Sequence, residues 1–113
     1  MNLTEYQKFC ERTAKKDFSS DTEEIMTWGL GVSGEAGDIA GCIKKTFAHK
    51  KNQEQGIKEN IGDTLWYMAM ICNFFKWDMS EVLQENINKL NERFSEGFGY
   101  KEVDRERIDW GEK

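Results

Sequence analysis

Hydrophobic residues recur at steps of three and four along most of this chain, which is the spacing of one face of an α-helix. The clearest run predicts a helix over about residues 55–76. Its apolar positions continue almost all the way round, as is typical of a buried central helix. Narrower stripes predict helices over about residues 4–18, 22–48 and 78–94. The chain has no proline, which suits long helices, so the pattern predicts an all-α four-helix bundle.

Glycine is unusually frequent within the predicted second helix, where each glycine costs roughly 1 kcal/mol relative to alanine. The glycines are Gly29, Gly31, Gly34, Gly37 and Gly41. We expect another helix to approach closely around residues 34–41, where the missing side chains leave room. We also expect the helix to bend near residues 29–31.

At 113 residues the chain is long enough for one domain with a small core. We expect that domain over residues 1–97 and a surface tail over residues 98–113, with at most a short helix at 102–107. So small a core cannot cover the long apolar helix. We therefore expect oligomerisation to complete the core, in a homodimer or a homotetramer.

Net charge and cysteine spacing limit the partners and the cellular compartment that we expect for this chain. Asp and Glu number 21 against 16 Lys and Arg, a net charge of −5, so duplex nucleic acid is not an expected partner. Because neither a signal peptide nor a transmembrane run is found, we expect no membrane association and a cytoplasmic location. The three cysteines lack CxxC spacing, which indicates buried free thiols in a reducing compartment.

Oxygen-bearing side chains gather on the two long predicted helices. Glu35 and Asp38 are three residues apart on the first, and Glu59, Asn60 and Asp63 lie within two turns of the second. Asp63 stands among apolar neighbours, where an unpaired carboxylate would cost several kcal/mol. Hard cations such as Mg²⁺ take oxygen ligands and bind substrate phosphates. The pattern favours a shared divalent-cation site over solvated acidic patches.

Several other kinds of site are excluded. His49 is the one histidine and falls in the polar segment between the two long helices, so no Ser-His-Asp or Cys-His system can be assembled. The sequence has no Glu-x-x-His motif of a ferritin-like di-iron bundle and no GxxxxGK[ST] phosphate loop.

The predicted fourth helix carries Asn86, Lys89 and Arg93 on one face, because they follow at steps of three and four. A lysine and an arginine one turn apart can hold a phosphate chain, although spacing alone favours a solvated flank. Lys44 and Lys45 are weaker candidates for the same task.

Two aromatic residues share a helix face with the acidic groups. Tyr67 lies four residues after Asp63 and could stack on a base or bond to the sugar. Trp28 lies seven residues before Glu35 and could cover a base, but a place in the core is the favoured interpretation.

Three sequence blocks stand in a fixed order between residues 30 and 97. They are GEAGDI at 34–39, ENIGDTLWY at 59–67 and NINKLNERF at 86–94. In order and spacing they resemble the MazG-like family of all-α nucleotide pyrophosphohydrolases, whose pattern is EExxE, ExxD and NxxKLxxR. This chain departs from the pattern at three positions: the first Glu of EExxE is Gly34, its third acid is Asp38, and the Glu of ExxD is Asn60.

The resemblance implies a set of site residues. The implied metal ligands, for Mg²⁺ or alternatively Mn²⁺, are Glu35, Asp38, Asn60 and Asp63. The implied catalytic base is Glu35 or Glu59. The implied contacts to the nucleoside triphosphate are Tyr67, Asn86, Lys89 and Arg93.

The implied activity is hydrolysis of an NTP or dNTP to the monophosphate and pyrophosphate. The departure at Asn60 leaves open a second function, a non-catalytic nucleotide-binding or regulatory relative with a degraded metal site. A purely structural helical dimer is a third alternative. Phosphoribosyl-ATP pyrophosphohydrolases, which share the superfamily, are a further one.

Overall fold

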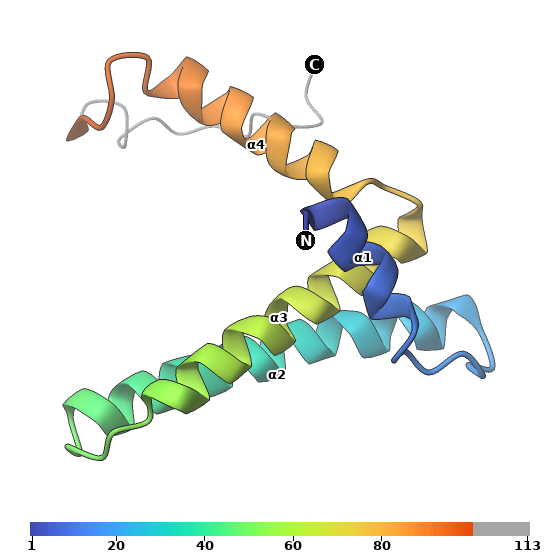
Figure 1. The fold of residues 1–113 in the computed structure, drawn as a ribbon, viewed down its shortest axis with the longest axis horizontal. Helices are drawn as coiled ribbons and strands as arrows, with labels where there is room; N and C mark the ends of the chain where they lie inside the picture. The colour runs from blue at the N-terminus through green and yellow to red at the C-terminus, as the bar shows by residue number, and fades with distance from the viewer. Residues whose placement is uncertain (101–113) are drawn as a thin grey trace. The chain divides into compact units, whose positions relative to one another are not determined.

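The computed structural model describes residues 1–100, and within them it contains four α-helices and no strand. The helices are α1 (Leu3–Glu11), α2 (Asp21–Phe47), α3 (Glu54–Phe75) and α4 (Met79–Arg93), as Figure 1 shows. The predicted all-α fold with four main helices is confirmed. The short helix predicted at 102–107 lies outside the described residues. No helix in the described part is both long and apolar enough to cross a membrane.

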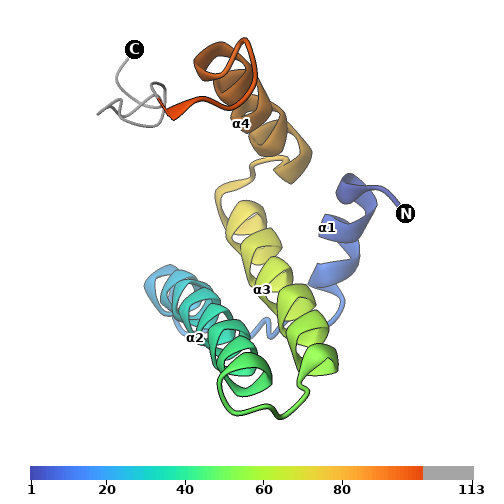
Figure 2. The ribbon, with the colours of Figure 1, turned by 90° about the vertical axis from the view of Figure 1, so that its left-hand side faces the viewer.

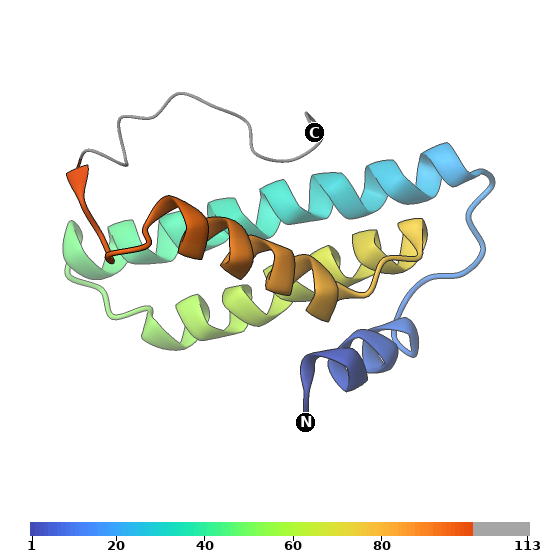
Figure 3. The ribbon, with the colours of Figure 1, turned by 90° about the horizontal axis from the view of Figure 1, so that it is seen from above.

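The chain forms two compact units, residues 1–79 and the residues from Ser80 onward. In the first unit α2 and α3 run antiparallel and lie side by side (Figures 2 and 3), because residues 48–53 turn the chain back on itself. This pair carries the acidic residues singled out in the sequence. The second unit contains α4 from Ser80 to its end.

The start of α2 follows from its sequence. The Ser20 hydroxyl oxygen accepts a hydrogen bond from the Glu23 N–H at 3.1 Å, which satisfies one of the free donors of the first turn. The Glu23 carboxylate accepts in return from the N–H of Ser19 at 3.2 Å and from its hydroxyl. These hydrogen bonds lower the pKa of the Glu23 carboxyl. The hydrogen bonds of Ser19, Ser20 and Glu23 thus set the helix boundary.

The prediction for the first helix was wrong at its C-terminal end. The N-cap is Asn2, whose Oδ1 accepts from the Glu5 N–H at 2.9 Å, and the helix ends at Glu11 rather than near Phe18. Phe18 instead lies in the connection to α2, where its ring meets Trp28 edge-to-face at a centroid distance of 5.3 Å. Because Phe18 is apolar and packs on the core from a loop, it made the apolar stripe of the predicted first helix look longer than the helix is.

The glycines of α2 also correct an expectation. A Cβ on Gly34, Gly37 or Gly41 would meet nothing within 4 Å, whereas a Cβ on Gly31 would overlap the Tyr67 ring. The close approach is therefore at Gly31 and not around residues 34–41. The helix continues without interruption through residues 29–31, so it does not break there, and the predicted bend stays a prediction.

The N-terminal helix is held to the end of α3 by the buried side chain of Gln7. Its Nε2 donates to Asn73 Oδ1 and to the Trp77 carbonyl, both at 2.8 Å. Its Oε1 accepts from the Met79 N–H, also at 2.8 Å. This amide is buried with every polar atom paired, so it fixes α1 at a single position on α3.

The core of the first unit is small. The buried apolar side chains are Cys10, Trp28, Ala69, Met70, Cys72 and Met79. No large side chain in residues 1–100 is fully buried. One face of α3 stays between 41% and 46% exposed, so the expectation that this helix is apolar and buried all round does not hold within the first unit. The exposed residues are Ile61, Leu65, Met68 and Phe75.

Candidate active site

Four carboxylates from two helices form an acidic cluster, defined here as Glu35 and Asp38 of α2 with Glu59 and Asp63 of α3. Partial burial raises the pKa of Glu35, and the negative charges of Asp63, Asp38 and Glu59 raise it further. The antiparallel pairing therefore places Asp38, Glu59 and Asp63 within electrostatic reach of Glu35.

The acidic cluster opens to solvent, because Glu35 is half-buried while the other three carboxylates are exposed. Within residues 1–100 no three Asp, Glu, His or Cys side chains lie close enough to hold a metal ion as they stand. The donors nevertheless suit a hard divalent cation, because all are negatively charged oxygens that repel one another. Exposed side chains change rotamer within nanoseconds, so the present separations of these carboxylates are not those that a bound ion would impose.

Asn60 lies in the seam between α2 and α3, beside the acidic cluster. Its Nδ2 donates to Cys42 Sγ at 3.7 Å, and Cys42 follows Asp38 by one turn on α2. The amide is thus directed toward α2 at the position where the family motif has a glutamate. The negative charge of neighbouring Glu59 acts on Glu35 of α2. Asn60 and Glu59, the two positions considered for the fourth metal ligand, therefore both lie near α2.

Tyr6 of α1 supports the turn of α3 that carries Asp63. Its hydroxyl donates to the Gly62 carbonyl at 3.3 Å. Burial, the Cys10 thiol and the charge of Asp63 raise the pKa of Tyr6 to about 12. Sequence reasoning missed this residue, since Tyr6 had no signal beyond membership in a weak apolar stripe.

The Tyr67 ring packs between the two long helices, over Gly31. Its centroid is 5.1 Å from that of Trp66 and 6.2 Å from that of Trp28. Trp28 is 3% exposed, which confirms its predicted place in the core. The packing of Tyr67 is clear, and its contact with a nucleoside stays a prediction.

Asn86, Lys89 and Arg93 share one face of α4, and each is half-buried. Because they belong to the second unit, their proximity to the acidic cluster is not established, and their predicted role in holding phosphates stays a prediction.

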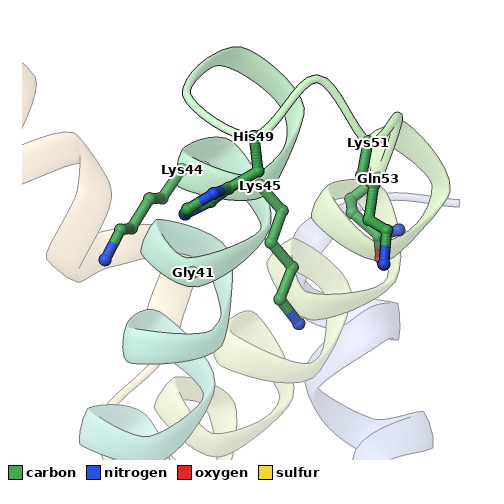
Figure 4. Close-up of a pocket in the computed structure, with 6 residues that line it drawn as sticks. All are labelled: Gly41, Lys44, Lys45, His49, Lys51 and Gln53. Carbon is green, nitrogen blue, oxygen red and sulfur yellow. The ribbon is translucent and has the colours of Figure 1, made fainter.

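A hollow of about 630 Å³ lies at the turn between α2 and α3. We call it the loop-end pocket, and Figure 4 shows its lining. The lining residues are Gly41, Lys44, Lys45, His49, Lys51 and Gln53. Sequence reasoning gave two of these lysines little weight and took the histidine as a loop residue. The sequence feature that could have predicted this pocket is the run of basic residues across 44–51.

Comparison with known families assigns the chain. The sequence model of the MazG nucleotide pyrophosphohydrolase domain matches residues 22–98, which is more than half of the chain. The chain belongs to the MazG family. The resemblance inferred from the three blocks is confirmed, and the MazG match includes the acidic cluster on α2 and α3. MazG domains form a family of nucleotide pyrophosphohydrolases, which are hydrolases.

A relative of this MazG protein is the Gene 37 protein of Mycobacterium phage L5. The two are 34% identical over 105 residues, which cover 86% of this chain and 92% of the phage protein. Its name states no activity. No solved structure matches the chain.

Proposed function

We propose that this MazG protein is a Mg²⁺-dependent hydrolase that converts a ribo- or deoxyribonucleoside triphosphate to the monophosphate and pyrophosphate. The acidic cluster is the observation that carries the proposal. Four like charges on facing helices destabilise the fold unless a cation joins them, which favours a binding role for the cluster. Membership in the MazG family supports the same activity.

Glu35, Asp38 and Asp63, with Asn60 or Glu59, would hold the metal. Bound Mg²⁺, or Mn²⁺ in its place, would neutralise charge on the phosphates and acidify a bound water. The acidic cluster is the only group of this kind that the spacing and the electrostatics both support in the described chain.

The protein's own groups would guide the proton and the substrate. A water oxygen bonds to the α-phosphorus while the bond from that phosphorus to the bridging oxygen breaks, and pyrophosphate leaves. Glu35 or Glu59, whichever is not a ligand, accepts the proton that the water loses. Tyr67 would contact the nucleoside. Asn86, Lys89 and Arg93 would contribute to holding the phosphates.

A pyrophosphate-release screen tests the activity. Purified protein is supplied with Mg²⁺ or Mn²⁺ and a panel of standard and modified nucleoside triphosphates. We expect Asp63→Ala to lower turnover by roughly two orders of magnitude or more, because metal catalysis contributes several kcal/mol. Asp17→Ala, which removes an exposed carboxylate outside the cluster, should keep wild-type turnover. Release that survives Asp63→Ala unchanged would count against the site.

A second candidate function rests on Asn60. One charge of the family motif is missing here, and the Asn60 amide donates to Cys42 instead. The alternative is a nucleotide-binding or regulatory protein without turnover. Nucleotide binding with no pyrophosphate release under any metal would favour it. Asn60→Glu then decides the cause, since a tighter Mg²⁺ affinity in that variant would assign position 60 to the metal site.

We also propose a homodimer or homotetramer, with a second copy covering the exposed face of α3. The lack of any fully buried large side chain in residues 1–100 supports this, because a stable core needs such burial. Light scattering after size exclusion would measure the mass. We expect Met68→Glu to dissociate the assembly and Lys58→Glu, a polar position on the same helix, to leave it intact. A monomeric wild type would refute the proposal.

A further inference from the structure

The loop-end pocket differs in charge from the rest of this acidic protein. Its lining holds three lysines and the only histidine, and no carboxylate is among its lining residues in the described chain. A second hollow, of about 540 Å³, also carries three lysines: Lys15, Lys16 and Lys76. That hollow balances them with the carboxylates of Glu11, Asp21 and Glu24. The loop-end pocket is therefore the basic one of the two.

Backbone hydrogen bonds of the loop hold the pocket in shape. The Lys51 N–H donates to the Lys45 carbonyl at 2.9 Å, which folds the loop back onto the end of α2. The Gln53 N–H donates to Thr46 Oγ1 at 3.0 Å. Lys50 takes a left-handed backbone conformation with φ of 53°, which a lysine adopts at some cost. These constraints bring residues 49–51 beside the lysines of the last helical turn.

The side chains surround a gap that a glycine leaves open. Figure 4 shows Lys44 and Lys45 leaving α2 on either side of Gly41, with His49 above. A Cβ at Gly41 would meet nothing within 4 Å. Three lysines line one hollow whose lining has no carboxylate, so their summed positive charge favours an anion with several negative oxygens. Lysine suits phosphate as a mobile point charge with three donors.

The pocket follows the acidic cluster along the same face of α2. Asp38 and Lys45 are seven residues apart, which is two turns and about 10.5 Å along the helix axis. Gly41 lies between them and presents no side chain. A polyphosphate whose inner phosphate is near the acidic cluster could extend along this face to the lysines.

We infer that the loop-end pocket binds the terminal phosphates of the substrate and the pyrophosphate that leaves, with Lys44 and Lys45 as the main contacts. The inference rests on the proposed function for its substrate, but the binding itself requires neither metal nor turnover.

Calorimetric titration with inorganic pyrophosphate tests the inference. The buffer contains EDTA and little salt, because salt screens exposed charges. We expect the wild type to bind, and Lys44→Gln/Lys45→Gln to raise the Kd by roughly tenfold or more through lost charge-assisted hydrogen bonds. The matched control is Lys15→Gln/Lys16→Gln, an adjacent lysine pair in the balanced hollow, whose Kd should stay within about twofold of the wild-type value. The double variant Lys44→Arg/Lys45→Arg should still bind pyrophosphate, because it keeps both positive charges. Such binding would show that substitution at these two positions does not itself disrupt the pocket.

The outcomes separate this inference from the proposed activity. Asp63→Ala should bind pyrophosphate at least as tightly as the wild type even though its turnover is lost. Binding without turnover in the wild type would therefore reject the activity and keep the pocket. No pyrophosphate binding by the wild type, or equal weakening in both lysine-to-glutamine pairs, overturns the inference whatever the turnover screen gives.

Discussion

The α2–α3 pair has an aromatic end, around Trp28, Trp66 and Tyr67, and a charged end, around Gly41 and the loop-end pocket. The two ends differ in what lies beside the helices. At the aromatic end, Trp66 meets Trp28 at 5.4 Å and Tyr67 at 5.1 Å, and the Tyr67 ring takes the place of a side chain at Gly31. At the charged end Gly34, Gly37 and Gly41 face open space, with carboxylates before Gly41 and lysines after it on α2. One end gains stability from packing, and the other leaves open the surface where we propose that metal and phosphates bind.

The largest effect is expected at the aromatic end. Trp28→Ala should lower the free energy of unfolding by about 3–5 kcal/mol, because a buried tryptophan leaves a cavity. Chemical denaturation followed by circular dichroism measures it. The control is Trp77→Ala, where the side chain is 52% exposed and the loss should be much smaller. Equal losses would mean that the aromatic end is not where the stability resides.

Two glycine substitutions on the same helix sharpen the comparison. Gly31→Ala should destabilise by about 1–2 kcal/mol, because the overlap with Tyr67 exceeds the helix propensity gained. Gly34→Ala should stabilise by up to about 1 kcal/mol, since its Cβ would meet nothing. The same denaturation experiment in a Tyr67→Ala background should remove the penalty at Gly31. A penalty that persists there would have another cause.

A substitution in the acidic cluster should separate activity from stability. Asp38→Asn is expected to lower turnover by roughly tenfold or more through weaker metal binding, while the melting temperature without metal stays level or rises because one repelling charge is gone. Parallel turnover and melting measurements on Asp17→Asn provide the reference. A fall in both quantities for Asp38→Asn would show that the carboxylate is structural.

The smallest effect is expected in the loop. Lys50→Gly should stabilise by about 0.5–1 kcal/mol, because glycine adopts a φ of 53° without a steric penalty. Lys51→Gly, where φ is not positive, should destabilise by a similar amount through chain entropy. If both changes act in the same direction, the strain at Lys50 is negligible.

Local patterns sufficed for much of this structure. The steps of three and four located both long helices, and the spacing of the acids put Asp38, Glu59 and Asp63 within electrostatic reach of Glu35. The role of these acids as metal ligands stays a prediction. The hydrogen bond between Ser20 and Glu23 at the start of α2 is equally local. Each of these features depends on residues within a few turns or on a simple antiparallel pairing.

Features that depend on distant partners could not be predicted. Tyr67 of α3 determines that Gly31, and no other glycine of α2, is the one closely approached. Phe18, which extended the apparent stripe of α1, packs on Trp28 from the connection to α2. The loop-end pocket exists because the Lys51 N–H returns to the Lys45 carbonyl, and no local sequence rule specifies that bond.

The buried amide of Gln7 has a consequence for the order of folding. Its bond to Met79 spans 72 positions in the chain, and its bond to Trp77 spans 70. The helix synthesised first is therefore the last of the first unit that can dock, since its partners emerge only after α3 is complete. We expect native-state hydrogen exchange at the Met79 amide to report the undocking of α1 alone, at a lower free energy than exchange from the middle of α3.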